Sequence, residues 1–432
     1  MPSVQQCPIA PGSSFTYRFK AELYGTTWYH SHYSSQYAGG LHGPLIVHGP
    51  RHAKYDSDLG PVFISDWYHQ DYFDLVKGVV GTEGGPFLPT PLAPSSDNNM
   101  INGKMNFNCS LVTDGTPCTS DAPLAKFKFK SGKTHRLRLI NSGAEGIQKF
   151  SIDGHTLTVI ANDFVPIKPY DTTVVTLGIG QRTDVIVRAI GKPTDSFWMR
   201  SSITVCATAN RPLALAKVFY ERANTSVVPQ STAWNDTTNP CANDPLEKTV
   251  PAYSITPTLT PDVTQNITIS GGFNATHHFN FRMNNSTFRA NYNNPLLLLA
   301  NQGNTTYPMD PQWNVYNFGK SKSIRIIVKN TFPAAHPMHL HGHNMFVLHV
   351  GPGLEWDGTI VNPQNPQRRD VQMLPKFSHM VIQFDADNPG VWPFHCHIAW
   401  HVSQGLYVNI MVSLPSYAAG DEASLSADRA RC

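Results

Sequence analysis

Three pairs of histidines, each pair separated by one residue, carry most of the chemistry available to this sequence. They are His30 and His32, His339 and His341, and His395 and His397. Alternate side chains of an extended strand point to the same face, so each pair directs two imidazoles to one side. Imidazole binds copper, zinc, iron and nickel. The three pairs together therefore predict a cluster of metal ions rather than isolated buried histidines.

One cysteine lies between the last two histidines, in the stretch "VWPFHCHIAWH" at 391–401. Two histidines and a cysteine thiolate with a weak fourth ligand form a blue-copper site. His336, Cys396 and His401 supply those three ligands. Leu406, ten residues after Cys396, would lie in the axial direction and cannot coordinate. We therefore expect a three-coordinate copper of high potential, with a zinc site as the alternative that spacing alone leaves open.

Composition is typical of a globular chain built from many short strands. Of the 432 residues, 41% are hydrophobic and only 15% are charged, with 34 prolines and 31 glycines spread throughout. Turn residues between short apolar runs favour strands over helices. The formal charge of +3 is small, which argues against nucleic acid as a partner. The apolar run "PLLLLA" at 295–300 is far shorter than the roughly 20 residues that span a bilayer, so no membrane partner is expected.

The pattern of strands predicts an all-β fold of repeated β-sandwich domains. Strand-like runs begin with "SFTYRFKAE" at 14–22, and the similar runs "HRLRLIN" at 135–141 and "SIRIIVKN" at 323–330 indicate a repeat. Residues rich in proline, threonine and asparagine separate the runs. The predicted parts are a piece of a first domain at 1–52, a second domain at 58–220, a linker at 221–265, a third domain at 266–415 and a tail at 416–432.

The cysteines and glycosylation motifs indicate a secreted protein. Eight Asn-x-Ser/Thr motifs lie in polar segments, and seven cysteines leave one thiol unpaired if the others form disulfides. Cys396, inside the histidine cluster, is the expected free thiol. The first ten residues lack a signal-peptide pattern. We therefore expect that the natural N-terminus is missing from this sequence.

The motifs resemble those of the multicopper oxidases. "GTTWYHSHYSSQYAGGLHGPLIVHGP", "HPMHLHGH" and "HCHIAWHVSQGL" are similar to three of the family's four copper-binding motifs, and the last most resembles fungal laccases of the ascomycete type. The resemblance implies tandem cupredoxin-like (plastocyanin-like) Greek-key β-sandwich domains. It also implies four copper ions. By resemblance, His336, Cys396 and His401 bind type 1 copper, His339 binds type 2, and the type 3 pair is bound by His30, His32, His341, His395 and His397.

The same resemblance implies a laccase reaction. A phenolic or aromatic substrate would give one electron to type 1 copper through His401, and four such electrons would reduce O₂ to water at the other three coppers. Asp163, in "DGHTLTVIANDFVP", is expected to take the phenolic proton, whereas Asp370 is expected to be structural. We expect a monomer that acts on small aromatic substrates and O₂.

A disulfide scheme also follows from the resemblance. It pairs Cys7 with Cys432, Cys109 with Cys118, and Cys206 with Cys241. Six cysteines allow fifteen pairings, so the sequence alone does not choose among them.

The match to laccases has one gap. The family's fourth motif, His-Trp-His-Gly, is absent, and residues 1–29 contain no histidine. We therefore expect an incomplete laccase whose first domain is truncated and which lacks oxygen turnover as it stands. Two alternatives stay open: a ferroxidase-like multicopper oxidase, and a copper-binding or electron-transfer module without oxygen chemistry.

Overall fold

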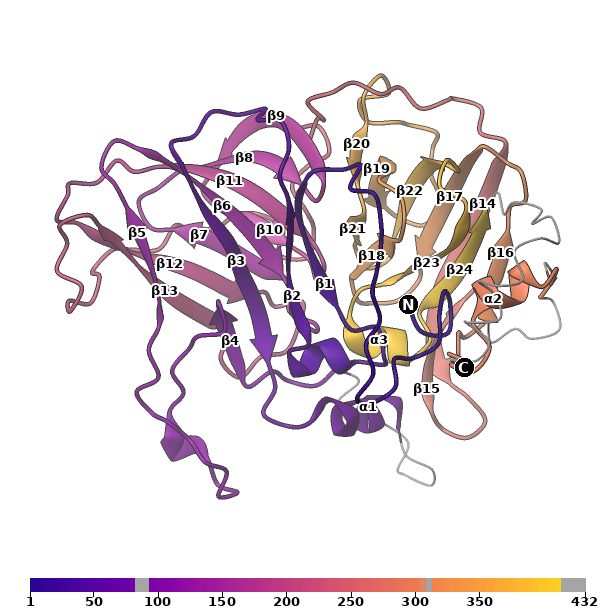
Figure 1. Ribbon diagram of the computed structural model, residues 1–432, viewed down its shortest axis with the longest axis horizontal. Helices are drawn as coiled ribbons and strands as arrows, with labels where there is room; N and C mark the ends of the chain where they lie inside the picture. Colours follow the sequence, from indigo (N-terminus) through magenta and orange to yellow (C-terminus); the bar gives the residue numbers. More distant parts are fainter. Residues whose placement is uncertain (82–92, 305, 308–312, 413–432) are drawn as a thin grey trace.

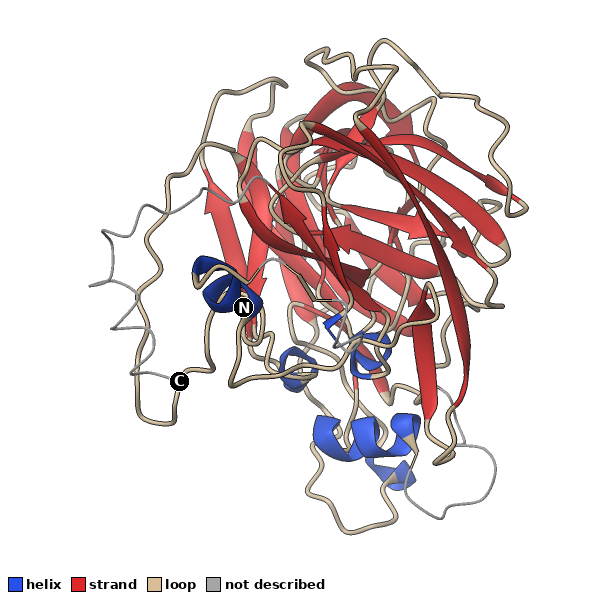
Figure 2. Cartoon of the chain, turned by 90° about the vertical axis from the view of Figure 1, so that its right-hand side faces the viewer, coloured by secondary structure: helices blue, strands red, loops and turns tan. Residues whose placement is uncertain are grey.

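Strands make up nearly all of the regular structure of the chain (Figures 1 and 2). The computed structural model describes residues 1–81, 93–304, 306–307 and 313–412. Within them the strands form two pairs of large sheets and one sheet of two strands. The predicted all-β fold is therefore confirmed.

The second domain consists of two sheets, drawn at the left of Figure 1. The six-stranded sheet contains β4 (Asn98–Ile101), β3 (Ser57–Trp67), β6 (Thr134–Asn141), β11 (Arg182–Arg188), β8 (Leu157–Asn162) and β9 (Val165–Thr172). The five-stranded sheet contains β10 (Val175–Leu177), β7 (Gln148–Ile152), β12 (Ser196–Ile203), β13 (Leu213–Tyr220) and β5 (Ala125–Phe129). In β5, Ala125, Phe127 and Phe129 are buried and the lysines between them are exposed. This alternation places one face of the sheet in the core.

The third domain repeats this arrangement at the right of Figure 1. Its six-stranded sheet contains β15 (Phe279–Met283), β14 (Val263–Phe273), β17 (Ser323–Asn330), β22 (Ser378–Asp385), β19 (Met345–Pro352) and β20 (Gln367–Arg369). Its five-stranded sheet contains β16 (Val315–Asn317), β24 (Tyr407–Val412), β23 (Gly390–Cys396), β18 (His336–Leu340) and β21 (Val371–Leu374). Every residue of β24 is buried, as expected for a strand covered on both faces.

The sequence repeat occupies the same place in both domains. "HRLRLIN" lies in β6 and "SIRIIVKN" forms β17, and each is the third strand of its six-stranded sheet. Each also pairs in parallel with the first long strand of its domain, β6 with β3 and β17 with β14. The repeated motif therefore marks equivalent positions in two sandwiches of the same topology.

The N-terminal segment contributes the two-stranded sheet of β1 (Gly25–His30) and β2 (His42–Val47), which lies between the two large domains (Figure 1). The strand predicted at 14–22 is wrong, since these residues have no strand pairing. Phe15, Tyr17 and Phe19 alternate as in a strand, but all three are exposed. An alternating pattern needs a neighbouring strand to take up its backbone hydrogen bonds, and no described segment does so here.

Short helices lie where the chain leaves a sheet. They are α1 (Tyr72–Val80), α2 (Leu296–Asn301), α3 (Ala399–Ser403) and the 3₁₀ turns η1 (Gln36–Gly39) and η2 (Cys109–Leu111). The Asp71 side chain accepts a hydrogen bond from the Phe73 amide and so caps α1. α3 follows β23 directly, and this position matters for the metal site below.

The segment between the two large domains runs along the outside of β9. Lys168 donates its backbone N–H to the Val250 carbonyl at 2.8 Å, and the disulfide Cys206–Cys241 fixes the segment to the end of β12. No strand of the described chain lies between the end of β13 at 220 and the start of β14 at 263. These positions are close to the predicted linker of 221–265, and the domain limits themselves stay predictions.

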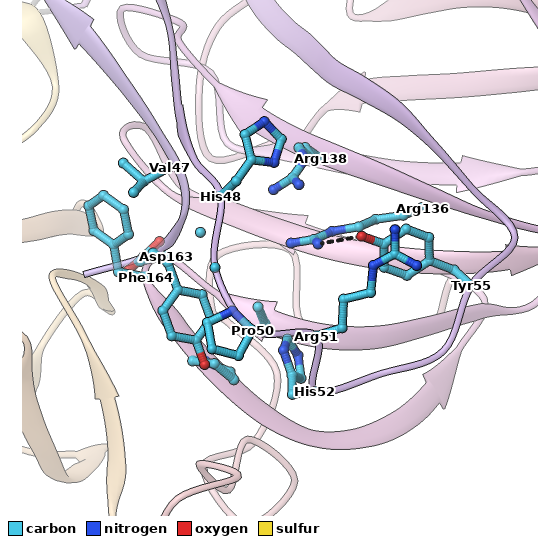
Figure 3. Close-up of a pocket in the computed structure, with 15 residues that line it drawn as sticks. Val47, His48, Pro50, Arg51, His52, Tyr55, Arg136, Arg138, Asp163 and Phe164 are labelled. Atoms are coloured by element: carbon cyan, nitrogen blue, oxygen red, sulfur yellow. Dashed lines mark hydrogen bonds between the residues drawn. The ribbon is translucent and has the colours of Figure 1, made fainter. Parts of the chain in front are cut away.

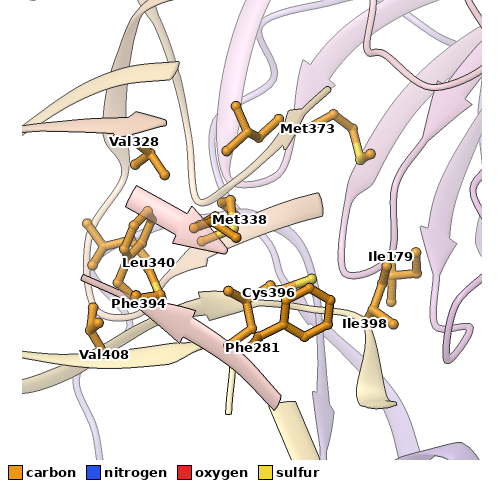
Figure 4. Packing of buried hydrophobic residues seen from close by; sticks show 14 of the residues in the cluster. Ile179, Phe281, Val328, Met338, Leu340, Met373, Phe394, Cys396, Ile398 and Val408 are labelled. Atoms are coloured by element: carbon orange, nitrogen blue, oxygen red, sulfur yellow. The ribbon is translucent and has the colours of Figure 1, made fainter. Parts of the chain in front are cut away.

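The largest buried apolar cluster lies in the third domain and extends to its contacts with the other two segments. Cys396 is part of it, with Phe281, Met338 and Phe394 among its neighbours (Figure 4). Trp28 from β1 and Ile179 from the second domain belong to the same cluster. The surroundings of Cys396 are therefore apolar on several sides, which limits the water that can reach its sulfur.

Candidate metal centres

The first centre is formed by His336, Cys396 and His401, all buried. The Nδ1 atoms of the two histidines lie 3.1 Å apart, and the Cys396 sulfur lies 3.4 Å from Nδ1 of His401 and 3.6 Å from Nδ1 of His336. Among the described residues this is the one group that brings three potential ligand atoms within 4.8 Å of one another. Two nitrogens and one sulfur facing a common point are the donor set of a blue-copper site.

Strand pairing and one helical turn produce this geometry. Met338 of β18 pairs with Cys396 of β23, which places the start of β18, and so His336, beside the cysteine. After Cys396 the chain turns at Ile398 into α3, and the His401 amide donates to the Ile398 carbonyl at 3.1 Å. This turn carries the His401 ring back toward the sulfur.

Burial keeps the three donors uncharged. It lowers the pKa of His336 to about 3, and it raises the pKa of the Cys396 thiol far above its usual range. A thiolate is stable in such a place only if a cation compensates its charge. The donors therefore fit a bound metal ion.

An apolar wall surrounds the first centre. Leu406 is completely buried in the same cluster as Cys396, and the Phe281 ring lies 4.6 Å from the His401 ring. The Leu406 carbonyl accepts from the Cys396 amide at 3.2 Å, so Leu406 is held beside the cysteine. A leucine side chain there excludes water and offers no ligand atom.

The second centre gathers all six histidines of the three pairs. The His30 and His32 rings stack at 4.1 Å, the His339 and His341 rings lie 4.4 Å apart, and the His395 and His397 rings lie 5.8 Å apart. Contacts of 5.2 to 5.6 Å connect the pairs, and those contacts are His30–His397, His32–His341 and His339–His395. The predicted cluster is thus assembled at the ends of β1, β18 and β23, with His32, His341 and His397 just beyond the strands.

Hydrogen bonds orient several of these rings. Nδ1 of His339 donates to the Asp370 carbonyl at 2.8 Å, Nδ1 of His30 to the Ser31 carbonyl at 2.9 Å, and Nδ1 of His395 to the Cys396 carbonyl at 2.7 Å. A carbonyl only accepts, so Nδ1 carries the proton and Nε2 stays available as a ligand. Burial lowers the pKa of His339 to about 4, which keeps its ring neutral at physiological pH.

The role predicted for Asp163 does not agree with its position. Its side chain is completely buried, and its oxygens accept from the Arg369 Nε at 3.0 Å and from the Arg182 amide at 2.9 Å. Burial by itself raises the pKa of Asp163, but Arg369 and Arg182 outweigh it and hold the pKa at about 2. A carboxylate so fully paired is a poor proton acceptor, and its contacts lead toward His339 through Asp370 rather than toward His401. These contacts favour a structural role for Asp163.

Asp370 has the structural contacts expected of it. Both of its oxygens accept from the Arg182 guanidinium at 2.6 Å, and its carbonyl orients His339. Burial raises the pKa of Asp370 to about 6, although Arg182 opposes that shift.

Sequence reasoning missed Glu145. This residue is 6% exposed and lies in the turn after β6, where the Ala144 carbonyl accepts from the Ala399 amide at the start of α3. Burial, with a further contribution from Asp66, raises the pKa of Glu145 well above its usual range, and its carboxyl is close enough to Cys396 to raise the pKa of that thiol. The signal in the sequence that could have pointed to Glu145 is a charged residue within the turn "NSGAEG", whose other residues are small.

Two disulfides are present in the described part of the chain, Cys109–Cys118 and Cys206–Cys241. Cys396 is a free, buried cysteine. Cys432, the predicted partner of Cys7, lies outside the described residues, so that pairing stays a prediction.

Comparison with known proteins identifies the family. Three family models described as multicopper oxidase match residues 1–52, 58–223 and 259–416. The chain belongs to the multicopper oxidases. This multicopper oxidase is 37% identical to Laccase-2 of Botryotinia fuckeliana over 431 residues, which cover 97% of the chain and 71% of that relative. The resemblance to fungal laccases is thereby confirmed.

Solved structures of multicopper oxidases are also similar to this chain. The crystal structure of the laccase from Botrytis aclada is 36% identical, with a TM-score of 0.89 over 99% of this chain and 78% of that one. Fet3p, "a Multicopper Oxidase that Functions in Iron Import", is 25% identical, with a TM-score of 0.83 over 95% of this chain and 77% of that one. This multicopper oxidase is therefore a laccase-type oxidoreductase with cupredoxin-like domains, and copper is its cofactor.

Proposed function

We propose that this multicopper oxidase removes one electron at a time from phenolic substrates at the Cys396 centre and reduces O₂ to water at the six-histidine centre. The observation that carries the proposal is the connection between the two centres. The sulfur ligand and two histidines of the second centre are consecutive in the chain as His395, Cys396 and His397. This gives a short covalent path for electrons.

The ligand assignment follows the family pattern. We assign His336, Cys396 and His401 to type 1 copper, with Leu406 as the axial residue that does not coordinate. Type 2 copper is assigned to His339, and the type 3 pair to His30, His32, His341, His395 and His397. Bound copper supplies the one-electron chemistry and the reduction of O₂. The protein fixes the donors and keeps water away from the sulfur.

His401 is proposed to receive the substrate's electron. It is 7% exposed, whereas His336 and Cys396 are completely buried. Among the three donors it is thus the one nearest to the surface. The buried Phe281 ring packs against it, with the two ring centroids 4.6 Å apart, and so helps to hold the His401 ring in place.

Glu145 is proposed to take the phenolic proton in place of Asp163. Oxidation of a phenol to its radical releases one electron and one proton, so four phenols supply the four electrons and four protons that convert one O₂ to two water molecules. A carboxyl with a raised pKa is a better proton acceptor at mildly acidic pH than one held at about 2. The Tyr68 and Trp400 side chains next to Glu145 favour its charged form.

The expected setting is that of a secreted monomer. The Asn-x-Ser/Thr motifs and the two disulfides support secretion. In the described part of the chain, no helix has the length and apolar character needed to cross a bilayer.

Oxygen uptake by the purified, copper-loaded protein tests the proposal against the expectation, drawn from the absent His-Trp-His-Gly motif, that residues 1–432 lack oxygen turnover. A simple phenol should drive O₂ consumption at four phenols per O₂, and ferrous iron should drive it much more slowly. Faster turnover with ferrous iron than with phenols would make the protein a ferroxidase, the alternative that similarity to Fet3p and the acid at Glu145 favour. Blue colour without O₂ uptake would leave only a copper-binding module and would contradict the proposal.

A further inference from the structure

A small pocket lined by cationic side chains lies between the loop that follows β2 and the sheet of β6 and β8 (Figure 3). Arg51, Arg136 and Arg138 line it, together with His48 and His52. None of the nine proposed copper ligands is among its lining residues, so the pocket is separate from both centres.

Arg136 retains an unused donor in this pocket. Its terminal nitrogen is paired with Asp184, and another donates to the Tyr55 hydroxyl at 3.3 Å. Its Nε–H is buried and has no hydrogen-bond partner among the described residues. A buried N–H of a charged group without an acceptor costs free energy, and a bound anion would supply that acceptor.

The second arginine of the pocket is Arg51. Its guanidinium lies over the Tyr55 ring, 4.9 Å from the ring centroid, and Arg136 lies 5.5 Å from the same centroid. Within the described residues no carboxylate lies at ion-pairing distance from Arg51. Both guanidinium groups therefore contact the same ring, and an anion bound in the pocket that they line would be attracted by both positive charges.

The carboxylates near the pocket are already used by other cations. Asp58 accepts from Arg138 at 2.6 Å, and Asp163 accepts from Arg369 and from backbone amides. The pocket thus keeps an excess of positive charge that its own acids do not compensate.

The pocket is the size of a small inorganic anion. Its volume is about 100 Å³, which holds several waters at roughly 10–15 Å³ each, whereas pockets for drug-sized organic ligands measure about 300–1,000 Å³. Glycines allow its walls to close. A Cβ on Gly49 would lie 2.3 Å from the Tyr24 ring, so the loop approaches that ring more closely than any other residue permits.

We propose that this pocket binds a tetrahedral oxyanion, either inorganic phosphate or sulfate. Arg51 contacts the anion from the pocket mouth, and the Arg136 side chain, which lines the pocket, turns its Nε–H toward the anion on binding. The oxygens of an oxyanion accept well from a guanidinium group, because several of its N–H donors point in the same direction. The bound anion connects the loop after β2 to the second domain and so steadies the two-stranded sheet that carries His30.

Calorimetric titration of the purified, copper-loaded protein with inorganic phosphate, and separately with sulfate, tests the site at constant ionic strength maintained with sodium chloride. We expect saturable binding of one anion per chain. The anion that binds more tightly, phosphate or sulfate, is the preferred ligand of the pocket. Arg51→Gln should weaken binding about tenfold or more, because it removes a charge-assisted contact. Arg51 is exposed, so the variant should fold normally.

Arg211→Gln is the matched control, since Arg211 also lies over an aromatic ring, that of Phe107, at 5.3 Å but outside the pocket. It should bind the anion as the unsubstituted protein does. Hydrogen exchange gives an independent measurement, and phosphate should slow exchange in residues 47–55. Equal binding by Arg51→Gln, a response to chloride as strong as that to phosphate, or unchanged exchange in this loop would each overturn the proposal.

Discussion

The sulfur of Cys396 lies 3.4 Å from Nδ1 of His401, five residues later in the chain. This approach depends on the single turn of α3, where the Leu406 amide donates to the His401 carbonyl at 2.9 Å. Two of the three donors of the first centre are therefore placed by local backbone structure. The third, His336, is placed by the pairing of β18 with β23.

Cys396→Ser should remove the blue thiolate-to-copper absorption. A serine hydroxyl stays protonated at neutral pH and does not replace a thiolate ligand. Copper content should fall by one ion per chain, and phenol oxidation should decrease by more than the ten- to hundredfold that is typical of outer-shell changes. Absorption spectra and copper analysis measure both effects. The exposed His69, replaced by alanine, serves as a control that keeps its colour; a blue Cys396→Ser protein would refute the assignment.

Glu145→Gln should slow the oxidation of phenols by about a hundredfold, since general bases contribute roughly that much or more. Ferrocyanide, which loses an electron but no proton, should be oxidised at nearly the normal rate. The raised pKa of Glu145 means that burial disfavours its charged form, so the neutral amide should not destabilise the fold. Steady-state rates with both substrates decide the matter, with the exposed Glu221→Gln as control. Equal slowing of both substrates would exclude a role in proton transfer.

Asp163→Asn should destabilise the protein by about 3–5 kcal/mol, because it leaves the buried Arg369 and Arg182 without their shared carboxylate. Asp171→Asn is the matched control, since Asp171 is exposed and accepts a hydrogen bond from Thr158. Its effect should stay within about 0.5 kcal/mol. Urea unfolding measures both changes.

The destabilisation by Asp163→Asn should depend on pH. The folded pKa of about 2 is lower than the roughly 3.9 of an unfolded aspartate, so the charged carboxylate stabilises the fold above about pH 4. That contribution decreases as the pH falls toward 2. The account would be contradicted if the difference in unfolding free energy between the unsubstituted protein and Asp163→Asn grew on acidification.

Removing the Cys206–Cys241 disulfide should cost more stability than removing Cys109–Cys118. The two close loops of 35 and 9 residues, and loop-closure entropy gives about 3–4 kcal/mol for the longer and about 2–3 for the shorter. Double alanine variants compared by urea unfolding provide the measurement. A larger loss from the shorter loop would show that entropy does not dominate.

The copper ligands could be proposed from the sequence because their signal is local. A spacing of two residues in a strand fixes the direction of His339 and His341 without knowledge of the fold, and the structure brings all three pairs together. The repeat between β6 and β17 is local in the same sense. The tandem sandwich was therefore predicted correctly.

What the sequence could not reveal depends on contacts between distant segments. Asp163 looks like any exposed acid until Arg369, 206 residues later, is placed beside it. Glu145 lies near Cys396 only because the turn after β6 packs on α3. The exposed run around Tyr17 has the pattern of a strand, but no pattern states whether a partner strand exists.

The hydrogen bond from the Tyr37 hydroxyl to the His397 carbonyl joins residues 360 apart, whereas the His336–His401 contact joins residues 65 apart. The entropy of closing a loop increases with the logarithm of its length, so the longer closure costs about 1.5 kcal/mol more. Contacts between distant segments also form late in folding. The Cys396 centre can thus accept copper once the third domain has folded, but the six-histidine centre must wait until both ends of the chain have met. In a refolding experiment, blue colour should therefore precede the binding of copper at the second centre.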